Sequence, residues 1–149
     1  MKEIEKTAQG ENFSAILIGK LSNLGDYELA LGPDVKIPGK VFGGAALKTN
    51  GCEFSFQLFK PGTETGFLHT HITHEELYFC LGGSGEFQVD GAIIPISEGS
   101  VVRVSPKGRR SARNTGENDL IILCVQYKAC AFTSEDASDG VLLPDKVEW

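Results

Sequence analysis

The three histidines of the chain, His69, His71 and His74, lie within six residues of one another. Side chains alternate between the two faces of a strand, so His69 and His71 should point the same way, about 7 Å apart. A strand that begins at Glu76 and pairs with this segment would return its carboxylate to the same face. Two neutral imidazoles and one carboxylate suit Fe(II), Mn(II), Ni(II) or Zn(II). The spacing therefore predicts a divalent-metal site on His69, His71 and Glu76.

Four more residues are candidates for the lining of a pocket around this site. Tyr78 and Cys80 follow Glu76 by two and four positions, so strand alternation predicts that they face the interior with it. Gln57 and Gln126 are amides within apolar segments, and a buried amide needs a hydrogen-bond partner. Ordinary core packing is the alternative interpretation for all four.

The elements that would position these residues are short strands. Eighteen glycines and regular turn residues separate the apolar segments of the chain. The Asp90-Gly91 pair is typical of a two-residue hairpin, because a type I′ turn needs positive φ at both positions. This punctuation predicts an all-β sandwich or barrel with strands near 45–49, 53–59, 69–81, 86–89, 92–96, 100–105, 110–114 and 119–127, with a turn at 72–75.

The two ends of the chain fit this pattern less well. Residues 13–18 and 26–31 could be strands of an N-terminal arm, which we expect to pack on the barrel or on a neighbouring subunit. The last segment starts polar and ends apolar, and we expect it to lie extended across the surface. Either end is too short for a core of its own, so the chain is interpreted as one domain.

Two segments, PGTETGFLHTHITHEELYFCLGGSG and EGSVVRVSPKGRRSARNTG, resemble the two motifs of the cupin superfamily in the right order. Six residues separate Glu76 from Gly83, as in the first motif, which favours Glu76 as the metal ligand. The resemblance implies a single cupin barrel, a double-stranded β-helix or jelly roll. Its expected parts are an N-terminal arm (1–44), a barrel core (45–128) and an extended C-terminal tail (129–149).

The second motif departs from the family at the histidine that supplies the fourth metal ligand. That position falls on Ser111 when counted from Gly108 and on Arg110 when counted from Asn114. A guanidinium cannot coordinate a metal, and a serine hydroxyl would be a weak ligand. Three outcomes follow: three protein ligands hold the metal, His74 replaces the fourth, or the metal is absent and Arg110 pairs with Glu76 or with an anionic ligand.

The resemblance implies a function class more than a reaction, because cupins include oxygenases, decarboxylases, isomerases, epimerases and binding proteins. We expect a divalent-metal-dependent enzyme that acts on a small polar or anionic molecule. The alternative is a non-catalytic binding or sensing module with a degenerate metal site. A metal-free, epimerase-like enzyme is a third and weaker hypothesis. A basic cluster in the second motif could recognise a carboxylate or phosphate, or be paired locally: Arg103, Lys107, Arg109, Arg110 and Arg113.

Composition narrows the partners. A formal net charge of −6 argues against nucleic acid and anionic membranes, and no segment has the ~20 apolar residues of a membrane helix. Four dispersed cysteines and a polar N-terminus predict reduced, buried thiols and a cytoplasmic protein. Large apolar residues occupy both faces of the central strands, so we expect a homodimer formed through a sheet face, as is common among cupins: Phe54, Phe56, Leu77, Phe79 and Leu81.

Overall fold

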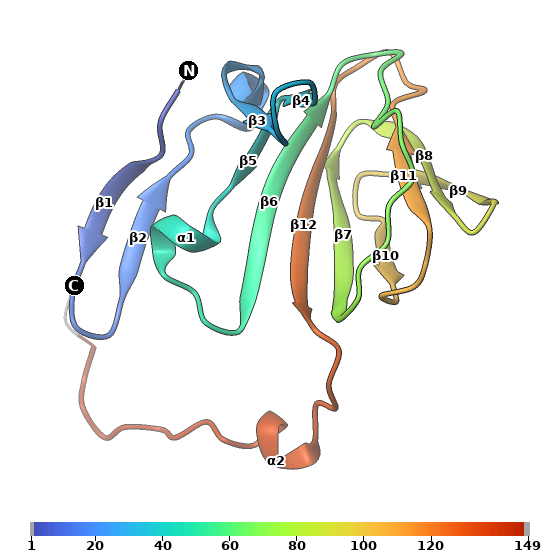
Figure 1. The fold of residues 1–149 in the computed structure, drawn as a ribbon. Coiled ribbons are helices and arrows are strands. Elements are labelled where there is room, and N and C mark those ends of the chain that lie inside the picture. Colours follow the sequence, from blue (N-terminus) through green and yellow to red (C-terminus); the bar gives the residue numbers. More distant parts are fainter. Residues whose placement is uncertain (1, 148–149) are drawn as a thin grey trace.

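The computed structural model describes residues 2–147. Its main layer is a five-stranded antiparallel sheet in the order β10–β7–β12–β6–β5 (Figure 1). The bounds of these strands are Val101–Val104, His74–Gly82, Leu120–Lys128, Cys52–Phe59 and Lys40–Phe42. The second layer is a three-stranded sheet in the order β11–β8–β9, with bounds Arg110–Arg113, Ser84–Val89 and Ala92–Ser97. The prediction of an all-β fold is confirmed.

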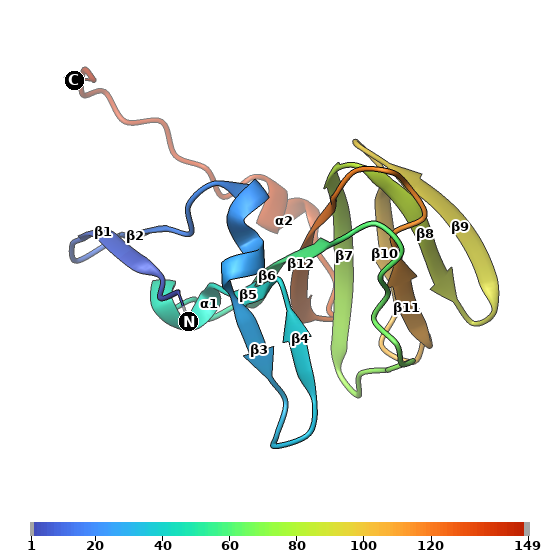
Figure 2. The same ribbon diagram turned by 90° about the horizontal axis from the view of Figure 1, so that it is seen from above.

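The main hydrophobic core lies between these two sheets, which stand beside each other in Figure 2. Strand β12 shows how the sequence builds it: Leu120, Ile122 and Cys124 are buried, while the residues between them are only partly buried. This period of two places every second side chain in the core. Phe87 of β8 and Val104 of β10 complete the same cluster from the other strands.

The N-terminal arm covers the outer face of one half of the main sheet. It comprises β1 (Glu5–Gln9), β2 (Ser14–Leu17), a 3₁₀ helix η1 (Leu21–Asp26) and the hairpin of β3 (Glu28–Ala30) and β4 (Lys36–Pro38). Leu24 and Tyr27 are buried in a second core, against which Phe54 and Phe56 of β6 pack. Strand β5, which lies within the predicted arm, belongs to the main sheet.

Two predicted strands are wrong in detail. Residues 45–49 were expected to be a strand, but Gly44–Leu47 form the short helix α1. Alanine favours helix, and the Glu53 carboxylate accepts a hydrogen bond from the Gly44 amide at 2.7 Å, which anchors the helix start. The segment from His69 is irregular, and β7 begins at His74 rather than at Glu76. His74 is therefore a strand residue and not part of a turn.

The tight hairpin at Asp90-Gly91 is present, with φ of 51° and 89° at its two residues. Both values are positive, as the type I′ turn requires.

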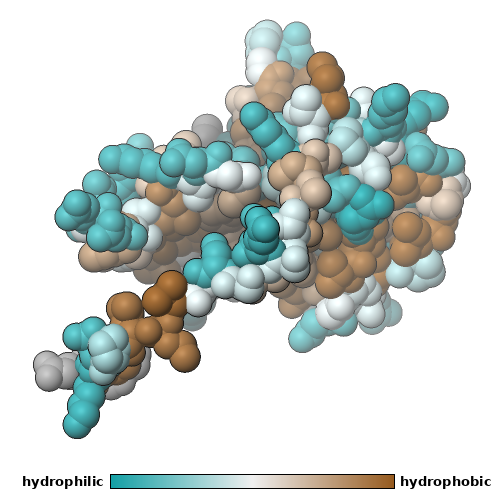
Figure 3. Space-filling model, turned by 90° about the horizontal axis from the view of Figure 1, so that it is seen from below, coloured by the Kyte–Doolittle hydropathy of each residue, from teal (hydrophilic) through white to brown (hydrophobic). Residues whose placement is uncertain are grey.

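The C-terminal tail stands away from the barrel instead of lying across it (Figure 2). It contains one short helix, α2 (Ser134–Ala137), and every residue from 128 to 147 is exposed. Figure 3 shows its apolar side chains as a patch apart from the body, and Val141, Leu142 and Leu143 are among the exposed apolar residues. The last two residues of the predicted tail lie outside the described range.

The burial of the four cysteines differs from the prediction. Cys80 and Cys124 are buried free thiols, as expected, but Cys52 and Cys130 are exposed, so burial of all four was wrong. No helix within residues 2–147 is long and apolar enough to cross a membrane.

Candidate metal centre

The ligand atoms of His69, His71 and Glu76 all lie within 4.8 Å of one another. The two histidines are held by the segment before β11 and by its first residue, not by pairing with β7. His69 forms a bridge with Arg110, with backbone N–O distances of 3.2 and 3.1 Å, and the His71 amide donates to the Pro106 carbonyl at 2.8 Å. Strand β7 brings Glu76 to the same interior from the neighbouring sheet.

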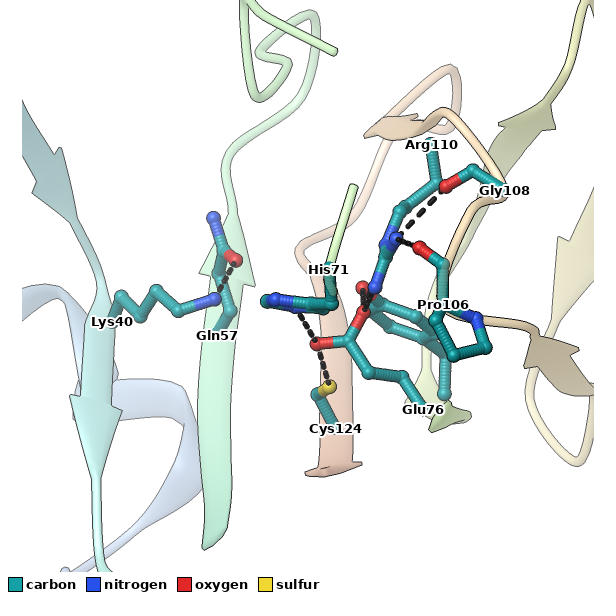
Figure 4. A network of polar contacts seen from close by, with 9 residues as sticks. Lys40, Gln57, His71, Glu76, Pro106, Gly108, Arg110 and Cys124 are labelled. Carbon is teal, nitrogen blue, oxygen red and sulfur yellow. Dashed lines mark hydrogen bonds and ion pairs between the residues drawn. The ribbon is translucent and has the colours of Figure 1, made fainter. Parts of the chain in front are cut away.

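The carboxylate of Glu76 is almost completely buried and accepts a hydrogen bond or ion pair from four side chains (Figure 4). Its Oε2 accepts from the Tyr78 hydroxyl at 2.5 Å and from Arg110, whose Nε lies 2.8 Å away. Its Oε1 lies 3.1 Å from His71 Nε2 and accepts a weaker contact from the Cys124 thiol at 3.5 Å. Burial alone would raise the pKa of Glu76, but the hydrogen bonds from Tyr78 and Arg110 and the charge of Arg110 lower it to about 2.

Arg110, at the start of β11, is completely buried and points at this carboxylate. Its Nη1 donates to the carbonyls of Pro106 and Gly108 at 3.2 and 2.8 Å, so the guanidinium is paired on both sides. A buried charge is tolerated when it is paired and hydrogen-bonded in this way. Of the two predicted positions for the missing fourth histidine, Arg110 is the one that reaches Glu76.

The imidazole of His69 is in the form that metal binding requires. Burial and the nearby charge of Arg110 lower its pKa to about 4, so the ring is neutral near pH 7. Its Nδ1 is buried, and the described residues offer it no hydrogen-bond partner. With the less heavily bonded Oε1 of Glu76, these donors fit a divalent transition metal. The chain thus carries a His-His-Glu cluster able to bind a metal.

The remaining predicted residues do not all take the places expected of them. Gln57, Gln126, Tyr78 and Ser111 line the cavity beside the cluster. His74 does not belong to the ligating group; its ring packs 5.2 Å from that of His71, measured between centroids.

The expectation that Cys80 lines the pocket is wrong. Its side chain lies in the main core, where the thiol faces the Gly82 and Gly83 carbonyls at 3.6 and 3.9 Å. Strand alternation correctly placed Cys80 on the inner face of β7, but at this position core side chains fill the interior.

The basic cluster is mostly a surface feature. Arg103 pairs with Glu75 and Arg113 pairs with Glu86, each with an exposed guanidinium. Lys107 and Arg109 are exposed. Only Arg110 of this cluster points inward.

The cavity has a volume of about 260 Å³ and is lined largely by apolar side chains. Sequence reasoning missed the part of its wall that comes from the N-terminal segment: Leu29, Leu31, Ile37, Lys40 and Phe42. It also missed Ser55 and Phe67. Strict alternation on β6 places Ser55 on the same face as Gln57 and could have pointed to Ser55. No local pattern identifies Lys40, because its strand joins the main sheet only in the folded chain.

Comparison with known proteins supports the same fold. The family model for a cupin domain matches residues 55–126. An oxalate-binding protein of Thermotoga maritima is 36% identical over 72 residues, which cover 48% of this chain and 59% of that protein. The chain spans 52% and 59% of the lengths of two curated relatives that it matches.

Two crystal structures extend the similarity to the fold. A cupin protein from Bacteroides fragilis is 27% identical, with a TM-score of 0.66 over 78% of this chain and 96% of that one. A predicted oxalate decarboxylase from Thermotoga maritima is 26% identical, with a TM-score of 0.57 over 68% of this chain and 90% of that one. The domain match and the two-layer fold agree, and the chain belongs to the cupin superfamily.

Proposed function

We propose that this cupin holds a divalent transition-metal ion on His69, His71 and Glu76 Oε1 and acts as an enzyme on a small anionic molecule bound in the adjoining cavity. The observation that carries the proposal is the convergence of the three donors within 4.8 Å at the wall of that cavity. When bound, such an ion supplies Lewis-acid polarisation of a ligand oxygen.

The surrounding residues prepare this site. Arg110 and Tyr78 hold Glu76 ionised and occupy its Oε2, which leaves Oε1 turned toward His71. The apolar walls keep bulk water from a bound molecule, which strengthens every charge interaction inside.

The relatives support a small anion as ligand. One bears the name oxalate-binding protein, and one structural neighbour is described as a predicted oxalate decarboxylase. Decarboxylase, oxygenase and isomerase chemistry are all compatible with such a site, so the reaction is left unassigned.

Metal titration tests the proposal. Chelator-treated protein is titrated with Mn²⁺, Ni²⁺ and Zn²⁺ in a calorimeter, and protein purified without chelator is analysed for metals. We expect one ion per chain, and a loss of affinity of at least about tenfold on His71→Ala, since even outer-shell changes at metal sites cost that much. His74→Ala is the matched control and should bind as wild type, because its ring is outside the donor group. Folded wild-type protein that takes up no ion would refute the metal site.

A second candidate function has its own observation. Arg110 already neutralises Glu76, as a metal would, and thus favours a metal-free module that binds its anionic ligand without chemistry. The same titration decides between the two candidates, because the second one requires that neither the wild type nor His71→Ala binds metal.

A further inference from the structure

Lys40 lies in the cavity on the side opposite Glu76 and Arg110. Its strand β5 pairs with β6, and its ammonium donates to the Gln57 amide oxygen at 3.2 Å. Figure 4 shows the side chain extended across the cavity toward His71. The Nζ also lies 5.4 Å from the centroid of the Phe42 ring. The chain therefore places a second cation beside the cluster, from an element far from either motif.

Within residues 2–147 this cation has no ion-pair partner. Glu76 is the one carboxylate among the described residues that line the cavity, and Arg110 is already paired with it. No carboxylate within residues 2–147 comes within ion-pair distance of Lys40. An ammonium has three donors, and Gln57 accepts only one of them. Burial lowers the pKa of Lys40, and the charge of Glu76 only partly opposes this shift.

A second polar group in the wall also lacks a partner. Ser55 lies two residues before Gln57 on the same face of β6, and it is only 1% exposed. Its hydroxyl finds no acceptor or donor among the described residues. A buried hydroxyl without a hydrogen bond costs folding free energy, so its presence in the same cavity wall as Lys40 points to a ligand that supplies the bond.

The rest of the cavity offers an apolar surface. Around the two polar groups stand the side chains of Phe42, Phe59, Phe67, Phe87, Leu31 and Ile37. The cavity volume is about 260 Å³. A ligand of this size that leaves these walls dry must carry an apolar body.

From these observations we infer that Lys40 and Ser55 form an anion subsite that binds the carboxylate of a small monocarboxylic acid with an apolar body. The inference rests on the proposed use of this cavity for a small anion, but it does not depend on the metal. It differs from an oxalate site in a specific way. Oxalate brings two negative charges and no apolar body, while Lys40 is the one cation of the described lining without an ion-pair partner, and most of that lining is apolar.

The test measures binding of hexanoate, hexanamide and oxalate by calorimetry, with chelator-treated and with metal-loaded protein. We expect hexanoate to bind at least about tenfold more tightly than hexanamide, since a charge-assisted hydrogen bond is lost with the charge. Lys40→Met should weaken hexanoate binding about tenfold or more, and Ser55→Ala about threefold. Lys60→Met is the matched control and should bind as wild type, because Lys60 pairs with Asp119 at the surface.

Several outcomes would overturn the inference. They are equal affinity for hexanoate and hexanamide, binding of oxalate but not of hexanoate, and a folded Lys40→Met variant that binds hexanoate as wild type does. Lys40→Met should melt at or above the wild-type temperature, because a partly buried charge without an ion-pair partner has been removed. The comparison of hexanoate with hexanamide uses the wild-type protein and stands even if a variant misfolds. Metal uptake is measured separately, so failure of the metal site and failure of the anion subsite are distinguishable.

Discussion

Arg110 controls the chemistry available to Glu76. Residue 110 lies directly opposite His69 in the backbone bridge, so its side chain enters the same space as the imidazole. Counted from Asn114, the cupin motif has its histidine at this position, whereas here a guanidinium binds Oε2 of the carboxylate. One side chain thus removes a potential metal ligand and supplies a permanent positive charge to the site.

This position can be tested by restoring the ligand. Arg110→His places an imidazole opposite His69 and removes the competing charge beside Glu76. Because loss of a mere outer-shell partner costs about 10- to 100-fold in metal affinity, gain of a direct ligand should raise the affinity for Zn²⁺ by about tenfold or more. Calorimetric titration measures this, and metal-dependent thermal stabilisation should grow with it.

Arg109→His is the matched control, since the neighbouring side chain is exposed and a histidine there cannot reach the cluster. If both variants bound Zn²⁺ as wild type does, the assignment of residue 110 to the fourth-ligand position would be wrong.

The turn between β7 and β8 fixes how these strands meet the start of β12. Gly83 has a φ of 79°, and a Cβ there would lie 2.3 Å from the Asp119 carbonyl oxygen and 2.8 Å from the Leu120 Cα. The chain needs glycine at this motif position for two reasons, the left-handed backbone and the close approach of another strand. The spacing of six residues from Glu76 to this glycine is therefore a packing requirement of the fold.

Gly83→Ala should lower the free energy of unfolding by about 2–4 kcal/mol, as left-handed strain and overpacking add. Gly91→Ala is a matched control with a φ of 89° and no atom within 4 Å of its Cβ position. Gly91→Ala should lower the free energy of unfolding by only about 1–2 kcal/mol, from the strain of the left-handed backbone alone. Urea unfolding of the two variants measures the difference, and equal losses would show that the contact with Asp119 does not matter.

At the scale of the whole molecule, an apolar row crosses the outer face of the main sheet. Cross-strand pairing aligns Val101, Phe79, Leu123, Phe56 and Val41 in order. The N-terminal arm covers the Phe56 end, where Val41 is buried. At the other end Val101 is 54% exposed. The arm thus covers only one half of the apolar outer face and leaves the other half exposed.

We expect a second copy of the chain to cover the exposed half and form a homodimer. Light scattering at micromolar concentration should give twice the chain mass of 16.1 kDa. Val101→Lys should shift the mass to that of the monomer, because a charge in a dry interface is costly. Ile93→Lys is the matched control: Ile93 is 49% exposed but lies on β9 of the other sheet. A monomeric wild-type protein would contradict the expectation.

Much of this molecule could be predicted from residues close together in the chain. His69, His71 and Glu76 were identified from spacing alone, and the strands after residue 52 follow the alternation of apolar residues. The predictions were wrong where this local information was weak. Residues 45–49 form a helix that the Glu53 carboxylate anchors, and His69 pairs with Arg110 instead of with β7.

The fold family and the set of potential metal donors could be predicted from the chain alone, because alternation and motif spacing act over a few residues. The pairing of Arg110 with Glu76 and the shared cavity of Lys40 and Ser55 are visible only in the folded chain. Lys40 reaches the cluster only after β5 pairs with β6, β6 with β12 and β12 with β7. Local spacing decides which face a side chain occupies, but long-range strand pairing decides which faces meet, and the charge balance of the pocket depends on that second step.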